Sequence, residues 1–135
     1  MLVNCVVYQD GKKLADIAQS EIHDYLVKPG CFVWVALRDA SDAELEDISK
    51  QFDLHELSVE DVRPGHQRPK IEEYGSEIFT VLHVVELKGE ELHVGEVDIF
   101  TGPNFVLSVR NRTEPESRNT TTVAASLGSA GLLTV

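Results

Sequence analysis

Two long apolar runs constrain the fold of this chain more than any other feature. One is Cys31–Leu37, which contains the sequence Phe-Val-Trp-Val, and the other is Glu77–Leu87. A strand with one wet face alternates polar and apolar residues, whereas a strand covered on both faces is apolar throughout. Both runs are therefore predicted to be strands that are covered on each side, and helices must supply the cover.

Three segments are predicted to be those helices. Ser41 is followed three residues later by Glu44, which is the pattern of a capping box, so a helix is expected from there to about Phe52. Its apolar positions recur at helical spacing and predict one buried stripe: Leu45, Ile48 and Phe52. A short helix is expected around Glu21–Leu26, and a third over Glu56–Val62.

Turn signals divide the rest of the chain into strands. Asp10-Gly11 predicts a hairpin between Leu2–Tyr8 and Lys13–Ile17. The second half reads as an antiparallel meander with strands at Lys70–Tyr74, Glu77–Leu87, Leu92–Thr101 and Phe105–Arg110. The predicted fold class is α/β: a mixed, largely antiparallel sheet sandwiched between helices in an α/β/α arrangement.

The hydrophobic pattern that predicts helices and strands ends after Arg112. Residues 113–122 are polar without a period, and residues 123–135 consist mainly of small residues with Leu and Thr. We predict one domain over residues 1–112 and a low-order tail, truncated or appended, over 113–135.

Charge and composition exclude several functions. The 135 residues carry a formal net charge of -11, which argues against nucleic acid as a partner because phosphate binding requires a cationic face. Cys5 and Cys31 lie in predicted strands and are expected to be buried, reduced thiols. No apolar stretch approaches the roughly 20 residues of a spanning helix, so the fragment is expected to be soluble, without a secretory signal.

Neither catalysis nor a transition-metal site is indicated. The chain shows no nucleophile elbow, phosphate loop, dinucleotide fingerprint or zincin helix, and we predict that it is not an enzyme. Its histidines lack the spacing of metal ligands, and His83 is expected to be a hydrogen-bonded core residue. The five are His23, His55, His66, His83 and His93.

Acidic residues accumulate in the middle of the chain. Between positions 39 and 61 there are nine acids and one base, Lys50: Asp39, Asp42, Glu44, Glu46, Asp47, Asp53, Glu56, Glu60 and Asp61. A solvated helix face explains such a run, and so does a surface that binds cations. Glu60 and Asp61 would lie near a helix C-terminus, where carboxylates oppose the helix dipole and a bound cation would relieve them.

Several motifs occur in an order that resembles one family, the cytoplasmic N-terminal domain of CorA-type magnesium transporters. The resemblance covers about Cys31–Arg112. It rests on five motifs: Phe32-Val33-Trp34-Val35, Leu54-His55, Val59-Glu60-Asp61, Gln67-Arg68-Pro69-Lys70 and Gly102-Pro103-Asn104-Phe105.

The resemblance implies a sensory domain of a homopentameric transporter on the cytoplasmic side of the cell membrane. Regulatory magnesium, or another divalent cation, would bind between protomers and control gating. Alignment with Val-Glu-Asp makes Asp61 the first candidate ligand and Glu60 the second. The family's stalk helix, membrane spans and Gly-Met-Asn pore signature have no counterpart in the sequence, so the chain alone is not expected to transport ions.

Two alternatives remain open. The same domain occurs in a related, ZntB-like zinc-transporting branch, and a stand-alone soluble interaction module would have no transport role. The basic residues that follow Asp61 also have two interpretations, as anchors to neighbouring acids or as part of interdomain signalling: Arg63, Arg68 and Lys70.

Overall fold

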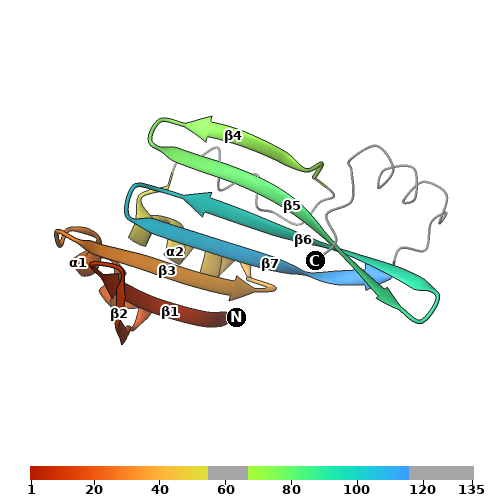
Figure 1. The fold of residues 1–135 in the computed structure, drawn as a ribbon, viewed down its shortest axis with the longest axis horizontal. Helices are drawn as coiled ribbons and strands as arrows, with labels where there is room; N and C mark the ends of the chain where they lie inside the picture. The colour runs from red at the N-terminus through yellow and green to blue at the C-terminus, as the bar shows by residue number, and fades with distance from the viewer. Residues whose placement is uncertain (55–66, 116–135) are drawn as a thin grey trace.

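The computed structural model describes residues 1–54 and 67–115 of the chain. Its main feature is a seven-stranded sheet with the strand order β2-β1-β3-β7-β6-β5-β4 (Figure 1). The pair β3–β7 is parallel and the other neighbours are antiparallel, so the sheet is mixed. The predicted fold class, a mixed and largely antiparallel sheet with helices, is confirmed.

The N-terminal hairpin forms as predicted. Strand β1 (Leu2–Gln9) pairs with β2 (Lys12–Asp16). Asp10 and Gly11 between them both have positive φ, at 50° and 80°. This backbone matches the twist of the two flanking strands, which is why Asp-Gly favours a two-residue turn.

The C-terminal half is an antiparallel meander of four strands. They are β4 (Lys70–Tyr74), β5 (Glu77–Lys88), β6 (Glu91–Thr101) and β7 (Phe105–Pro115). The predicted strands are confirmed, although β7 runs past its predicted end at Arg110. The division into a domain over 1–112 and a tail remains a prediction.

Strand β3 (Cys31–Arg38) joins the two halves. It pairs with β1 on one side and with β7 on the other, with Val33 in register with Phe105 and Leu37 with Val109. These side chains alternate, so the odd-numbered residues of β3 are buried and the even-numbered ones half-buried up to Ala36. A position inside the sheet agrees with the apolar sequence of this strand.

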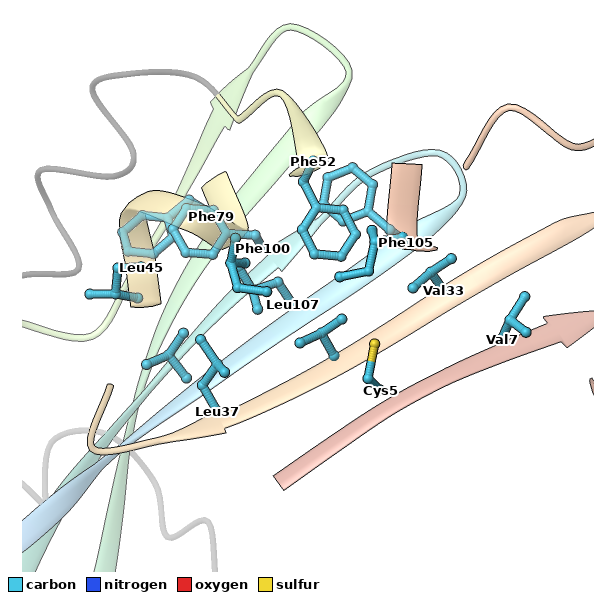
Figure 2. Close-up of a cluster of buried hydrophobic side chains, with 14 of the residues drawn as sticks. Cys5, Val7, Val33, Leu37, Leu45, Phe52, Phe79, Phe100, Phe105 and Leu107 are labelled. Atoms are coloured by element: carbon cyan, nitrogen blue, oxygen red, sulfur yellow. The ribbon is translucent and has the colours of Figure 1, made fainter. Parts of the chain in front are cut away.

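One face of the sheet carries the core and the helices. The predicted short helix is a 3-10 turn (Gln19–Glu21) followed by α1 (Ile22–Leu26), and the longer one is α2 (Asp42–Phe52). Buried Ile22 and the predicted stripe Leu45, Ile48 and Phe52 join the same cluster as Val33 and Leu107. Figure 2 labels Leu45, Phe52, Val33 and Leu107 within this cluster. Both described α-helices therefore pack on one side, which we call the helix face; the opposite side is called the outer face.

Cover on both sides of the whole run Glu77–Leu87 was an incorrect expectation. From Leu82 onward the side chains of β5 are exposed: Leu82 by 41%, Val85 by 38% and Leu87 by 65%. The reason is geometric, because the β5–β6 hairpin extends beyond α1, α2 and the N-terminal strands (Figure 1). An apolar run alone cannot show how far a strand outreaches its neighbours.

Three smaller predictions can be compared directly. Cys5 and Cys31 are buried free thiols, as expected, and burial raises the pKa of Cys5. His83 is exposed on β5, so its assignment to the core was wrong. Within the described part of the chain, no helix is long and apolar enough to cross a membrane.

Candidate functional site

The predicted metal ligands Glu60 and Asp61 lie outside the described residues, in the segment 55–66. The predicted helix Glu56–Val62 lies in the same segment. The structure describes its two flanks, α2 before it and Gln67 with β4 after it. In residues 1–54 and 67–115, no group of three or more His, Cys, Asp or Glu side chains is placed to hold a metal ion.

The start of α2 is fixed by Glu44. The Ser41 backbone N–H donates to Glu44 Oε2 at 2.9 Å, and the Glu44 backbone N–H donates to Ser41 Oγ at 3.2 Å, which completes the predicted capping box. The N-terminal ammonium of Met1 also donates to Glu44 Oε2, at 3.0 Å. The Ser41 backbone hydrogen bond, followed by the bond from the ammonium, lowers the pKa of Glu44.

The exposed surface of α2 is acidic. Glu46 pairs with Lys50 at 2.9 Å, and this hydrogen bond lowers the pKa of Glu46 and raises that of Lys50. Asp42 and Asp47 are exposed and have no ion pair among the described residues. The solvated part of the predicted acidic run is thus present on α2, next to the segment that contains the candidate ligands.

The helix ends at Asp53, immediately before that segment. Asp53 adopts the left-handed conformation, with φ 53° and ψ 46°, and the Leu54 N–H donates to Ser49 O at 3.0 Å. A residue in this conformation closes a helix by satisfying its last carbonyl groups. The chain therefore enters segment 55–66 from a fixed helix end.

On the other flank, two strands hold the backbone of Gln67. His83 Nε2 donates to the carbonyl oxygen of Gln67 at 2.5 Å, and the Gln67 N–H donates to Glu96 Oε2 at 3.4 Å. His83 and Glu96 are cross-strand neighbours on β5 and β6. The histidine that sequence placed in the core is instead an anchor for the point where the segment rejoins the sheet.

The basic residues after Asp61 behave differently from one another. Lys70 pairs with Glu72 at 3.0 Å, which confirms its interpretation as an anchor to a neighbouring acid. Tyr74 also donates a short hydrogen bond to Glu72, and this bond, followed by that from Lys70, lowers the pKa of Glu72. Arg68 is exposed and forms no ion pair within the described part of the chain, and Arg63 lies outside it.

The motif Gly102–Phe105 has an architectural role. Asn104 Nδ2 donates to the carbonyl oxygen of Leu26 at 2.7 Å, at the end of α1, and Phe105 stacks on Phe52 of α2 at 4.6 Å between ring centroids (Figure 2). A Cβ atom on Gly102 would lie 2.1 Å from the Phe105 ring, so no larger residue fits without movement. The motif connects β7 to both helices.

Sequence reasoning missed a buried carboxylate. Asp98 on β6 is 0% exposed and lies on the helix face, between Val81 and Val109 in register. A carboxylate at this depth requires a partner, because burying a charged group without one costs on the order of several kcal/mol in desolvation. The sequence feature that could have indicated this burial is the position of Asp98 two residues before Phe100, on the same face of β6.

Comparison with known proteins shows which family this chain belongs to. Residues 30–127 match the family model described as "CorA-like Mg2+ transporter protein". A putative metal ion transporter of Bacillus subtilis, YfjQ, is 35% identical over 82 residues, which is 61% of this chain and 25% of YfjQ. A putative metal ion transporter of Schizosaccharomyces pombe, C27B12.12c, is 36% identical over 53 residues, 39% of this chain and 7% of that protein.

Solved structures share the fold at lower sequence identity. Full-length CmaX has a TM-score of 0.59 and 17% identity, over 94% of this chain and 38% of CmaX. The complete CorA magnesium transporter of Methanocaldococcus jannaschii has a TM-score of 0.58 and 13% identity, over 99% of this chain and 40% of that one. The soluble domain of the same transporter has a TM-score of 0.53 and 16% identity, over 95% of this chain and 47% of that domain. The chain thus spans less than half of each of these relatives.

Proposed function

Because the chain belongs to the CorA-like Mg2+ transporter family, we propose that it is the regulatory domain of a divalent-cation transporter. In this proposal it lies on the cytoplasmic side of the membrane and binds magnesium at interfaces between copies of itself. The observation that carries the proposal is the family match over residues 30–127, which includes the predicted ligands Glu60 and Asp61.

Asp61 is the proposed principal ligand and Glu60 the secondary one. Magnesium prefers hard oxygen ligands and retains several of its waters, so one or two carboxylates from each copy suffice to hold it. Adjacent residues of a helix point about 100° apart, so these two carboxylates would contact different partners and would not chelate one ion within a copy. The proposed site is complete only where two copies meet, as in a homopentamer.

The acidity of the neighbouring helix supports this role. Exposed carboxylates on α2, including Asp42 and Asp47, add to the net charge of -11 and raise the local concentration of cations. Copies of such a chain repel one another, and a divalent cation between them lowers the repulsion. Cytosolic magnesium would therefore favour a closed assembly, and its removal would loosen it.

Transport itself is assigned to the rest of the transporter. The chain corresponds to 25% of YfjQ and 40% of the complete M. jannaschii transporter. We propose that this part senses the ion and does not conduct it. The name of YfjQ specifies a metal ion but not which one, so zinc is included as a competing ion in the test.

The experiment is sedimentation velocity of the 135-residue chain. Wild type and Asp61→Asn are compared in magnesium, in zinc and in a monovalent salt of equal ionic strength. We expect magnesium to shift wild type toward larger species, and Asp61→Asn to require a higher concentration. Glu90→Gln, in the β5–β6 turn, is the matched control. Equal responses of wild type and Asp61→Asn would refute the assignment of Asp61, and a response to zinc alone would assign the domain to zinc.

A further inference from the structure

The backbone of Gln67 is held by two side chains from different strands. Its carbonyl oxygen accepts a hydrogen bond from His83 Nε2 of β5 at 2.5 Å, and its N–H donates to Glu96 Oε2 of β6 at 3.4 Å. His83 and Glu96 lie opposite each other in the β5–β6 register. Both backbone polar groups of this one residue are therefore bound by a single cross-strand pair.

The cross-strand pair lies on the helix face of the sheet. Val81 and Asp98 are buried on that face and are in register with each other. His83 and Glu96 each lie two residues away from them along the same strands, and residues two apart in a strand share a face. The point where the chain leaves segment 55–66 is therefore fixed on the side of the sheet that carries α2.

Stability of the β5–β6 pairing does not by itself explain this pair. Glu96 Oε1 is buried and has no hydrogen-bond partner among the residues that the structure describes, which costs free energy. The next row on the same face is Val85 opposite Val94. An apolar pair of that kind would join the two strands without this cost. The backbone that the polar pair holds accounts for its presence.

The held residue is close in sequence to the proposed magnesium ligand. Asp61 lies six residues before Gln67, and six residues span at most about 20 Å when fully extended. The other end of the segment starts at Asp53, the fixed end of α2. A segment fixed at both ends has fewer conformations than one fixed at a single end, so it loses less entropy when its carboxylate binds an ion.

We infer that His83 and Glu96 are positioning residues for the magnesium response, and that they act by holding Gln67 and do not touch the ion. The inference rests on the proposed function, because it assigns to these two residues the placement of Asp61. Release of Gln67 leaves the carboxylate chemically able to bind magnesium. It lowers the fraction of chains in which the carboxylate is placed to do so, and this raises the magnesium concentration that the response requires.

Substitutions that keep or remove one hydrogen-bonding group test the inference. His83→Gln keeps an N–H donor of similar reach, and His83→Met removes it. Glu96→Gln keeps an oxygen acceptor, and Glu96→Met removes it. Within each pair the two variants have the same charge and nearly the same size. The control is His93→Met, because His93 alternates with the helix-face residues of β6 and so belongs to the outer face of the same hairpin.

The measured quantity is the magnesium concentration at half association of the 135-residue chain, by sedimentation velocity. We expect each methionine variant at positions 83 and 96 to require roughly three- to tenfold more magnesium than its glutamine counterpart, the size that one hydrogen bond supplies. His93→Met should respond as wild type. Circular dichroism shows that each variant is folded, and exposed His83 is a position where replacement leaves the core intact.

A merely structural role would shift urea unfolding and leave the magnesium response of the folded chain unchanged. Equal magnesium midpoints for the methionine and glutamine variants would therefore overturn the inference. Combination with Asp61→Asn adds a second test. If His83 acts only by placing Asp61, His83→Met should add little to the shift that Asp61→Asn already causes. An undiminished further shift in the Asp61→Asn chain would also overturn it.

Failure of this inference is distinguishable from failure of the proposed function. If Asp61→Asn shifts the magnesium midpoint and the methionine variants do not, the positioning role is wrong and the magnesium site stands. If wild type and Asp61→Asn respond equally, or if wild type does not respond to magnesium, the proposed function is wrong and the positioning role is overturned with it.

Discussion

At Glu44 a single exposed carboxylate connects three parts of the chain. It accepts hydrogen bonds from the Ser41 N–H and from the Met1 ammonium, and the same ammonium donates to the carbonyl oxygen of Arg38 at 2.7 Å. The start of α2, the start of β1 and the end of β3 therefore meet at one side chain. These bonds to its charged form lower the pKa of Glu44.

The lowered pKa predicts an acid-dependent loss of stability. A carboxylate whose folded pKa is depressed stabilises the protein above its ordinary pKa, and this contribution is lost as the pH falls through the folded value. We expect Glu44→Ala to unfold at lower urea concentration than wild type at neutral pH. The difference should shrink on acidification. Urea unfolding at several pH values measures it, and Glu90→Ala is the control. A difference that is constant with pH would contradict the electrostatic explanation.

Sequence predicted part of this arrangement and not the rest. The Ser41–Glu44 spacing specifies the capping box because both partners lie within one helical turn. The contact with Met1 could not be predicted, since it depends on β1 pairing with β3 across more than thirty residues, as the separation of 43 between Met1 and Glu44 illustrates. Asp98 was missed for the same kind of reason, because its burial depends on strands on both sides of β6.

At the scale of elements, α2 packs on the sheet through its buried stripe, which includes Phe52. The Phe52 ring is 4% exposed and stacks on Phe105, which the Gly102–Phe105 turn places at the start of β7. The helical period of the sequence predicted the buried stripe because local spacing determines which residues share a helix face. The exposed end of β5 was not predicted, because cover depends on the lengths of other elements.

Truncating this ring should release much of the attachment. Phe52→Ala is expected to cost about 3–5 kcal/mol of unfolding free energy, because it removes a large buried side chain and leaves a cavity. Phe32→Ala removes the same atoms from a half-buried position on the outer face and should cost less. Urea unfolding of both variants measures the difference. Equal losses would show that the two faces of the sheet are equally covered.

For the whole molecule, local pairings could be predicted and the long-range one could not. Asp10-Gly11 and the turns of the meander specify antiparallel neighbours, whereas the parallel pair β3–β7 joins strands about seventy residues apart, as the Val33–Phe105 register shows. The candidate ligands came from the order of family motifs. The flanks of segment 55–66 then proved to be fixed, by Asp53 on one side and by His83 and Glu96 on the other.

The central claim is that Asp61 senses magnesium for a transporter. The most direct measurement is the current through the full-length transporter that carries this domain, recorded while magnesium is raised on the cytoplasmic side of a membrane patch. We predict that the wild-type current falls as magnesium rises. Asp61→Asn should require more magnesium for the same fall, and Glu90→Gln should behave as wild type. Closure of Asp61→Asn at the wild-type magnesium concentration would contradict the account.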